Sequence, residues 1–303
     1  MASLLQLFAN GIIFGSIILL ASVGLSLLYG IGNFANFAHG ELLTVGAYAA
    51  FVGRVEFGLP FWIAVAASMV ATGAVGLALD RALFVRHRDS SPIVLLIVTI
   101  GVALVLRSLI RMIWTNQLRS YRLPLRRGIE FVDATVPVAG YDLLLRLRVT
   151  VNDAAIVAVA AAFAAGIHLF LTRTKIGVAM RATADNRSLA KVTGIDTDRV
   201  LRATWGLSGA LAAVGGVFLG VQTGVIMPRM GFNVLLIAFA AVILGGIGSP
   251  YGAMVGAYVI GVAQEMSIAL PGVTASYRAA VSFLILVGVL LVKPEGIAGG
   301  RWG

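Results

Sequence analysis

Runs of apolar residues about as long as a lipid bilayer is thick recur along this chain, and they constrain its fold more than any other feature. The first run, residues 4–29, contains no charged residue, and a helix of about 20 apolar residues spans the hydrocarbon core. Lipid offers no partner for backbone hydrogen bonds, so such segments cross it as helices. Charged residues make up only 12% of the 303 residues, against about 25% in soluble domains. The sequence therefore predicts an all-α polytopic membrane protein.

We expect about eight to nine transmembrane helices in a single transmembrane domain that covers residues 1–303. The apolar runs that predict them cover residues 4–29, 42–53, 61–84, 93–114, 154–171, 200–222, 232–244, 253–270 and 277–292. Lys and Arg favour cytoplasmic loops, but the two longest loops carry similar numbers of them. With nine spans, the basic loop that contains Arg86 and Arg88 and the tail that contains Lys293 fall on the same side as the polar segment at about residues 173–199. That segment is therefore expected in the cytoplasm, and the N-terminus outside it.

The longest loop of the first half, about residues 115–151, is expected on the extracytoplasmic side. Apolar and polar residues alternate from Leu145 to Val151, and such alternation predicts a strand. We expect a small extramembrane β element here, followed by a helix that Asn152 and Asp153 cap.

A strongly polar segment, residues 173–199, lies between the fifth and sixth apolar runs and contains the pattern of a short amphipathic helix. Asp185 is a suitable N-cap residue, and Gly194 suits a left-handed helix end. Thr197 and Asp198 are expected to cap the next helix, which begins near residue 200. The segment is either an interfacial helix without a partner or a docking element that receives force from another subunit.

Two glycine-rich breaks interrupt the apolar runs. Residues 30–33 and 246–249 share the pattern Gly-Ile-Gly, and each is followed further on by Val-Gly-Ala-Tyr. Unpaired backbone groups are tolerated in a membrane only inside protein or at a cavity, and paired interruptions in the two halves of a chain point to a transport pathway. The breaks therefore predict pseudo-repeated halves whose breaks face the same side.

Polar residues at the breaks and within the eighth apolar run are the candidates for a translocation pathway, because polar groups inside a membrane are costly and tend to be functional. The candidates are Asn33, Asn36, His39, Glu41, Ser249, Tyr251 and Gln264. Each has a second interpretation: the ionisable pair at the first break can lie in water at the cytoplasmic interface, and the two asparagines can satisfy free backbone groups. Arg107, late in the fourth run, is expected to extend to the interface.

The sequence excludes several classes of function. It has no cysteine, so disulfides and thiolate metal sites are absent, and its three dispersed histidines give no zinc-ligand spacing. It contains no G-x-x-x-x-G-K-[ST] motif, so the chain is expected to be no enzyme and to hold no cofactor. The net charge of +10 suits contact with anionic lipid headgroups, and no nucleic-acid partner is expected.

Five motifs stand out along the chain: GLSLLYG at residues 24–30, NFAHG at 36–40, RTKIGVAMRATADNRSLAKVTGIDTDRV at 173–200, GGIGSPYGAMVGA at 245–257 and KPEG at 293–296. Together they resemble the permease subunits of branched-chain amino acid ABC importers. The match runs nearly end to end and in order. The sequence is similar to the H-type subunit of the Liv family. The resemblance is specific for the permease class and much less so for the transported solute.

The resemblance implies that residues 184–194 form a cytoplasmic coupling helix that inserts into a groove of a partner ATPase. The residues assigned to it are Ala184, Asp185, Arg187, Leu189, Ala190, Lys191 and Gly194. It further implies a second, homologous permease subunit, usually in a heterodimer. Two ATP-binding subunits that hold ATP and Mg and an extracytoplasmic solute-binding protein complete the set. The implied location is the bacterial inner membrane, and the implied cargo is leucine, isoleucine, valine or a similar small polar solute.

Two alternatives remain open from the sequence. An ion-coupled secondary transporter needs acidic residues inside helices, for which only Glu41 and Glu265 qualify, and it leaves the basic segment unexplained. The same ABC class carrying urea or amides is the second alternative.

Overall fold

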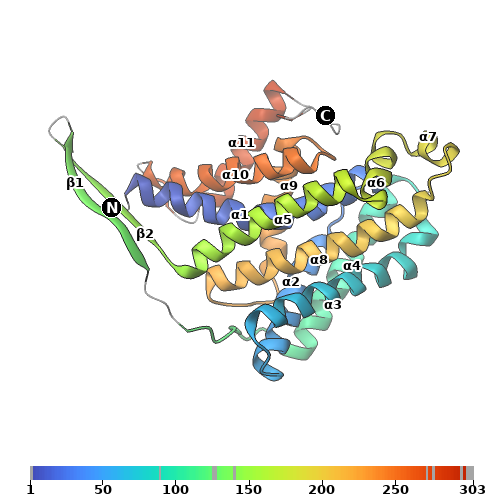
Figure 1. Ribbon diagram of the computed structural model, residues 1–303, viewed down its shortest axis with the longest axis horizontal. Coiled ribbons are helices and arrows are strands. Elements are labelled where there is room, and N and C mark those ends of the chain that lie inside the picture. The colour runs from blue at the N-terminus through green and yellow to red at the C-terminus, as the bar shows by residue number, and fades with distance from the viewer. Residues whose placement is uncertain are drawn as a thin grey trace.

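The computed structural model describes residues 3–88, 90–124, 128–138, 141–270, 272–274, 277–293 and 296–297. It is an elongated helical bundle in which most of the long helices run along one direction (Figure 1). A β-hairpin projects from the end where α1 begins, and α6 and α7 lie at the opposite end. Pro294 and Glu295 of the KPEG motif lie outside the described residues.

Helices lie at each of the nine apolar runs, and two further helices occupy the polar segment. The α-helices are α1 (Leu4–Gly32), α2 (Ala38–Phe51), α3 (Phe61–Ala82), α4 (Pro92–Trp114), α5 (Val151–Arg173), α6 (Lys175–Asp185), α7 (Arg187–Val192), α8 (Thr197–Thr223), α9 (Met230–Gly245), α10 (Pro250–Met266) and α11 (Arg278–Val292). A π-helical turn (Val52–Glu56) extends α2, and 3-10 turns lie at Phe84–His87 and Ser267–Ala269. The strands are β1 (Ile129–Val138) and β2 (Tyr141–Val149).

Within the described residues, six helices are long and apolar enough to cross a membrane: α1, α3, α4, α5, α8 and α10 with the turn that follows it. At about 1.5 Å per residue, α9 and, without its π-helical turn, α2 are roughly 24 and 21 Å long, less than the hydrocarbon thickness of about 30 Å. The number of eight to nine spans stays a prediction.

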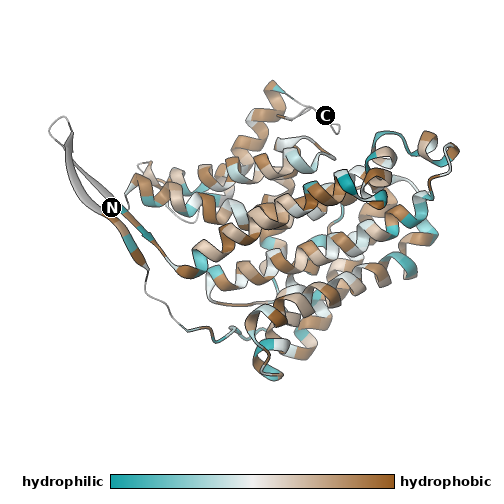
Figure 2. Ribbon diagram, viewed as in Figure 1, coloured by the Kyte–Doolittle hydropathy of each residue, from teal (hydrophilic) through white to brown (hydrophobic). Residues whose placement is uncertain are grey.

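Two helices form the centre of the bundle. In the most apolar stretch of α1, 89% of residues are buried inside the protein, and 78% in that of α8. The corresponding value is only 22% to 28% for α3, α4 and α5. Hydrophobic residues cover the long helices, whereas hydrophilic residues gather near α6 and the adjoining helix ends (Figure 2). Peripheral helices with apolar outer faces suit contact with lipid tails.

The predicted strand exists and pairs as a hairpin. β1 and β2 are antiparallel, with Ile129 opposite Val149 and Val138 opposite Tyr141. The helix after it is capped differently from the prediction: Thr150 is the N-cap of α5, and it forms a capping box with Asp153. Asn152 lies inside the first turn of α5 and is not the cap, because the shorter Thr150 side chain already accepts from the Asp153 amide.

The polar segment also uses different caps from those predicted. Asn186, not Asp185, caps α7, since its side chain accepts from the Leu189 amide at 3.0 Å. Asp196 caps α8 by accepting from the amides of residues 198 and 199. In each case a residue one or two positions from the predicted cap has a non-helical backbone, as an N-cap requires. Gly194 does have a left-handed backbone, with φ +88°, as expected.

Candidate translocation pathway and coupling segment

The segment between α1 and α2 turns back into the bundle. The His39 ring contacts the Ala21 carbonyl through Nε2 at 2.8 Å and the Ser208 hydroxyl through Nδ1 at 3.2 Å. Ala21 and Ser208 lie near the middles of α1 and α8. At about 1.5 Å per residue, α1 rises about 16 Å from Ala21 to Gly32. An extended chain from Gly32 to His39 can cover that distance, so the first break returns from the end of α1 to the middle of the bundle.

The N-terminal ends of α2 and α9 meet at this depth. A Cβ added to Gly231 would lie 1.8 Å from the Gly40 carbonyl oxygen, and the Gly231 amide donates to the Thr44 hydroxyl at 3.2 Å. The chain reaches α9 from the end of the molecule that carries the hairpin, where Arg119 and Ile226 exchange backbone hydrogen bonds of 3.0 and 2.7 Å. Two short helices therefore start at mid-depth, one after each re-entrant segment.

A buried ion pair neutralises the carboxylate in the first turn of α2. The Arg107 Nε donates to Glu41 Oε1 at 2.9 Å, and a second guanidinium nitrogen contacts the same oxygen. The Arg107 guanidinium also lies 4.6 Å from the centre of the Phe232 ring, a cation–π contact. Arg107 was expected to extend to the membrane interface, and that expectation is wrong, because Glu41 is fully buried and requires a counter-charge.

Asn36 lies two residues before the start of α2. Its Oδ1 accepts from the amide of Ala38, the first residue of α2, at 3.0 Å. The buried Nδ2 has no hydrogen-bond partner among the described residues. Of the seven pathway candidates, Asn36, His39 and Glu41 are buried at the start of α2 and contact different partners.

The other four candidates lie elsewhere. Asn33 has a left-handed backbone that ends α1. Ser249 caps α10 by accepting from the Gly252 amide at 3.1 Å. The Tyr251 hydroxyl pairs with His168 Nδ1 of α5 at 2.9 Å, and Gln264 donates to Ser282 of α11. These residues perform local capping or join neighbouring helices, and they do not line one continuous site.

The coupling residues are divided between two short helices, because Asn186 interrupts the helix that was expected to run from 184 to 194. Ala184 and Asp185 end α6, and the other helical candidates, Arg187, Leu189, Ala190 and Lys191, belong to α7. Within α7, Ala190 is buried, whereas Leu189 and Val192 are 61% and 85% exposed. The coupling role of these residues stays a prediction.

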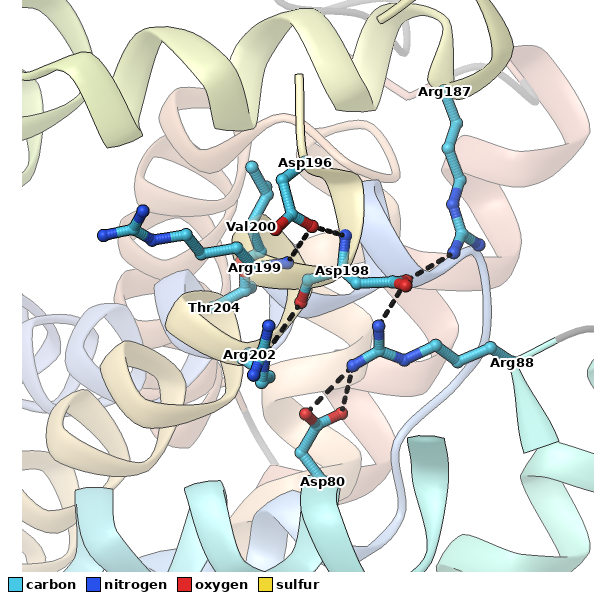
Figure 3. Close-up of polar contacts among 9 residues, drawn as sticks. All are labelled: Asp80, Arg88, Arg187, Asp196, Asp198, Arg199, Val200, Arg202 and Thr204. Atoms are coloured by element: carbon cyan, nitrogen blue, oxygen red, sulfur yellow. Dashed lines mark hydrogen bonds and ion pairs between the residues drawn. The ribbon is translucent and has the colours of Figure 1, made fainter. Parts of the chain in front are cut away.

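A charge network ties α7 to the membrane helices (Figure 3). One guanidinium nitrogen of Arg88 contacts the two carboxylate oxygens of Asp80 at 3.1 and 3.3 Å, and another contacts Asp198. Arg187 of α7 approaches the same Asp198 oxygen at 3.7 Å. The Arg202 Nε donates to the Asp198 carbonyl at 3.4 Å. These contacts join four parts of the chain: the end of α3 at Asp80, the turn before α4, the start of α8, and α7.

Most of this network was not predicted from the sequence. Asp80 is an acidic residue at the end of an apolar run, and Arg88 follows it eight positions later. That spacing was a usable signal, because a buried carboxylate needs a partner. No such signal marks Ser208, whose contact with His39 joins positions 169 residues apart. Among the described residues, no group of three or more His, Cys, Asp or Glu could hold a metal ion.

Together these features define a class: a multi-pass helical membrane protein with re-entrant segments and buried polar groups at mid-depth, an arrangement typical of membrane transport proteins. Residues 7–290 match the family model described as "Branched-chain amino acid transport system / permease component". The chain belongs to this family.

Curated relatives cover nearly the whole chain. It is 34% identical to the high-affinity branched-chain amino acid transport system permease protein LivH of Escherichia coli, over 97% of this chain and 95% of the relative. Identity to the corresponding protein BraD of Pseudomonas aeruginosa is 32% over the same shares of both chains. A probable branched-chain amino acid transport permease, LivH of Methanocaldococcus jannaschii, is 29% identical over 98% of this chain and 93% of the relative.

Proposed function

We propose that this chain is the membrane permease subunit of an ATP-driven ABC importer that carries leucine, isoleucine and valine across the bacterial inner membrane. The observation that carries the proposal is the near full-length identity to permeases named for branched-chain amino acid transport. The chain is not an enzyme: it is a permease component, and ATP hydrolysis falls to separate ATPase subunits, which would bind the ATP and Mg.

The two ends of the molecule suit different partners. The proposed ATPase contact is α7, with its exposed Leu189 and Val192. Beside it, a groove of ≈ 750 Å³ lies between α6 and the segment at residues 194–200. The opposite end carries the hairpin and a pocket of ≈ 450 Å³ lined by residues that include Tyr121 and Gln222. That end is the proposed docking side for an extracytoplasmic solute-binding protein, and a second permease subunit completes the complex.

The proposed pathway passes the start of α2, where Asn36, His39 and Glu41 are buried. A charged substrate carboxylate and ammonium need polar partners inside a membrane, and the unpaired Nδ2 of Asn36 is one candidate partner. The glycine-rich breaks support a matched arrangement, since a Cβ on Gly30 would lie 3.1 Å from the Gly248 Cα. The pseudo-repeat and the pathway remain proposals.

The ion-coupled alternative has little support. Its two candidate ion carriers are both paired: Glu41 with Arg107, and Glu265 with Arg278 at 3.0 Å. A carboxylate engaged by arginine is a poor carrier for a cation, because the guanidinium must first be displaced. Urea or amides as cargo are separated from branched-chain amino acids by the uptake experiment below.

The test is uptake by proteoliposomes that contain this chain, candidate partner permease and ATPase subunits, and a binding protein. We expect leucine uptake to require both ATP and binding protein. The variant Leu189→Glu with Val192→Glu should abolish it, because two carboxylates replace the apolar contact. Ile93→Glu, an exposed apolar position in the first turn of α4 and outside α6, α7 and the turn that carries Arg88, is the control. Uptake that follows an ion gradient without ATPase subunits would contradict the proposal, and uptake of urea but not leucine would change the cargo.

A further inference from the structure

We propose that Arg88 is a positioning residue for transport: held between Asp80 and Asp198, it couples the movement of α7 to the membrane helices α3 and α8. The inference rests on the proposed function of α7 as the ATPase contact. It starts from the geometry of one guanidinium that contacts two carboxylates on different helices.

The two carboxylates differ in burial, so one contact of Arg88 is fixed and the other can change. We call this group of Arg88, Asp80 and Asp198 the joint. The Asp80 side chain is fully buried and the Arg88 side chain is 8% exposed, whereas Asp198 is 58% exposed. A buried ion pair is costly to separate, while an exposed pair exchanges readily with water. Arg88 is therefore fixed to α3, and its contact with Asp198 is the one that can change when Arg187 and α7 move.

Movement at Asp198 is passed along a closely packed helix pair. A Cβ on Gly76 of α3 would lie 2.6 Å from the Trp205 carbonyl oxygen of α8, and one on Gly209 would lie 2.7 Å from that of Thr72. Backbones this close leave little room for independent sliding. A shift at the start of α8 is thus carried toward Ser208, which contacts His39 at the first break.

A second line of contact leads from the same turn to the break. Phe84, four residues before Arg88, lies 4.5 Å from Trp205 between ring centres, and 5.8 Å from Phe34 in a stacked arrangement. Phe34 belongs to the re-entrant segment before α2. The turn that carries Arg88 therefore touches both α8 and the segment that closes the middle of the bundle.

Contact alone does not demonstrate coupling, so the test pairs a structural readout with a functional one. The chain has no native cysteine, so Val85→Cys with Val192→Cys places one spin-label pair across the joint, from the turn to α7. In the purified full chain we expect one narrow distance distribution. Arg88→Met should broaden it, and Arg86→Met, an exposed arginine of the same turn, should leave it unchanged. An unchanged distribution in Arg88→Met would overturn the proposal, whatever the transport activity.

In the reconstituted complex, Arg88→Met should lower leucine uptake per ATP hydrolysed about tenfold, which corresponds to about 1.4 kcal/mol, with assembly retained. Uptake per ATP hydrolysed in Arg88→Lys should lie between the values for the wild type and Arg88→Met, because an ammonium cannot bridge two carboxylates as the planar guanidinium does.

The double variant Asp80→Asn with Arg88→Met removes the unpaired buried carboxylate, so a simple folding defect would be relieved. We expect it to remain uncoupled; restored uptake per ATP would show that Arg88 merely neutralises Asp80 and would overturn the proposal. If the wild-type complex takes up no leucine with ATP, the proposed cargo or class fails instead, and the distance distribution still decides whether the joint exists.

Discussion

The Glu41–Arg107 pair and the Asp198–Arg187 pair place the same two kinds of charge in opposite surroundings. Glu41 is fully buried and Arg107 is 13% exposed, at the start of a re-entrant helix. Asp198 and Arg187 are 58% and 40% exposed, at the polar end of the bundle. Removing one partner of a buried pair costs about 3–5 kcal/mol, while exposed pairs contribute about 0–1 kcal/mol. The first pair therefore holds the fold, and the second can form and break during a transport cycle.

The largest effect is expected at the buried pair. Arg107→Met leaves the Glu41 carboxylate buried without its counter-charge and should destabilise the protein by about 3–5 kcal/mol, seen as a large drop in melting temperature in detergent. Arg107→Met combined with Glu41→Leu should recover much of the loss, because no buried charge remains. A single variant as stable as the wild type would contradict the importance of this pair.

A smaller loss of stability is expected where α2 meets α9. Gly231→Ala adds a methyl group against the Gly40 backbone, and overpacking costs about 1–3 kcal/mol. Gly166→Ala, at a helical glycine with no atom within 4 Å of the added carbon, is the matched control and should be neutral or slightly stabilising. Equal melting temperatures for the two variants would show that α2 and α9 do not approach this closely.

Arg187→Gln tests the other half of the comparison. Because the pair is exposed, its loss should lower the free energy of unfolding by no more than about 1 kcal/mol, so the melting temperature should change little. Leucine uptake per ATP hydrolysed should fall. A loss of stability as large as that of Arg107→Met would remove the distinction between a structural and a movable pair.

The smallest effect concerns Asp196. Hydrogen bonds from the Arg199 and Asp198 amides, with nearby arginines, lower the pKa of this N-cap carboxyl. Since the folded pKa lies below the unfolded value, the cap stabilises α8 above the unfolded pKa, and that contribution is lost as pH falls through the folded pKa. Asp196→Asn should therefore weaken this acid dependence while keeping the cap, as melting curves between neutral and acidic pH can show. An identical pH profile in the variant would contradict this assignment.

The sequence revealed the class, the positions of the apolar helices and the strand, because each rests on local periodicity and length. It did not reveal that α2 and α9 start at mid-depth, since a short apolar run is compatible with a thin span or a half-length helix. The partners of Glu41 and Asp80 lie 66 and 8 residues away. Only the Asp80–Arg88 pair is close enough in sequence to be predicted from local spacing. His39 was selected as a candidate from its place in the first break, but its burial and its contact with Ser208 of α8 follow from no local pattern.

The most direct test of the account is water access at mid-depth. Asn233 is exposed in the first turn of α9, and Val105, 59% exposed in the middle of α4, is the control on an outer helix. In the assembled complex in proteoliposomes, Asn233→Cys should react with a charged, water-soluble thiol reagent at a rate that ATP and leucine change. Val105→Cys should stay unreactive. If Asn233→Cys reacts no faster than Val105→Cys in any of these conditions, the mid-depth ends of α2 and α9 do not lie on a transport pathway.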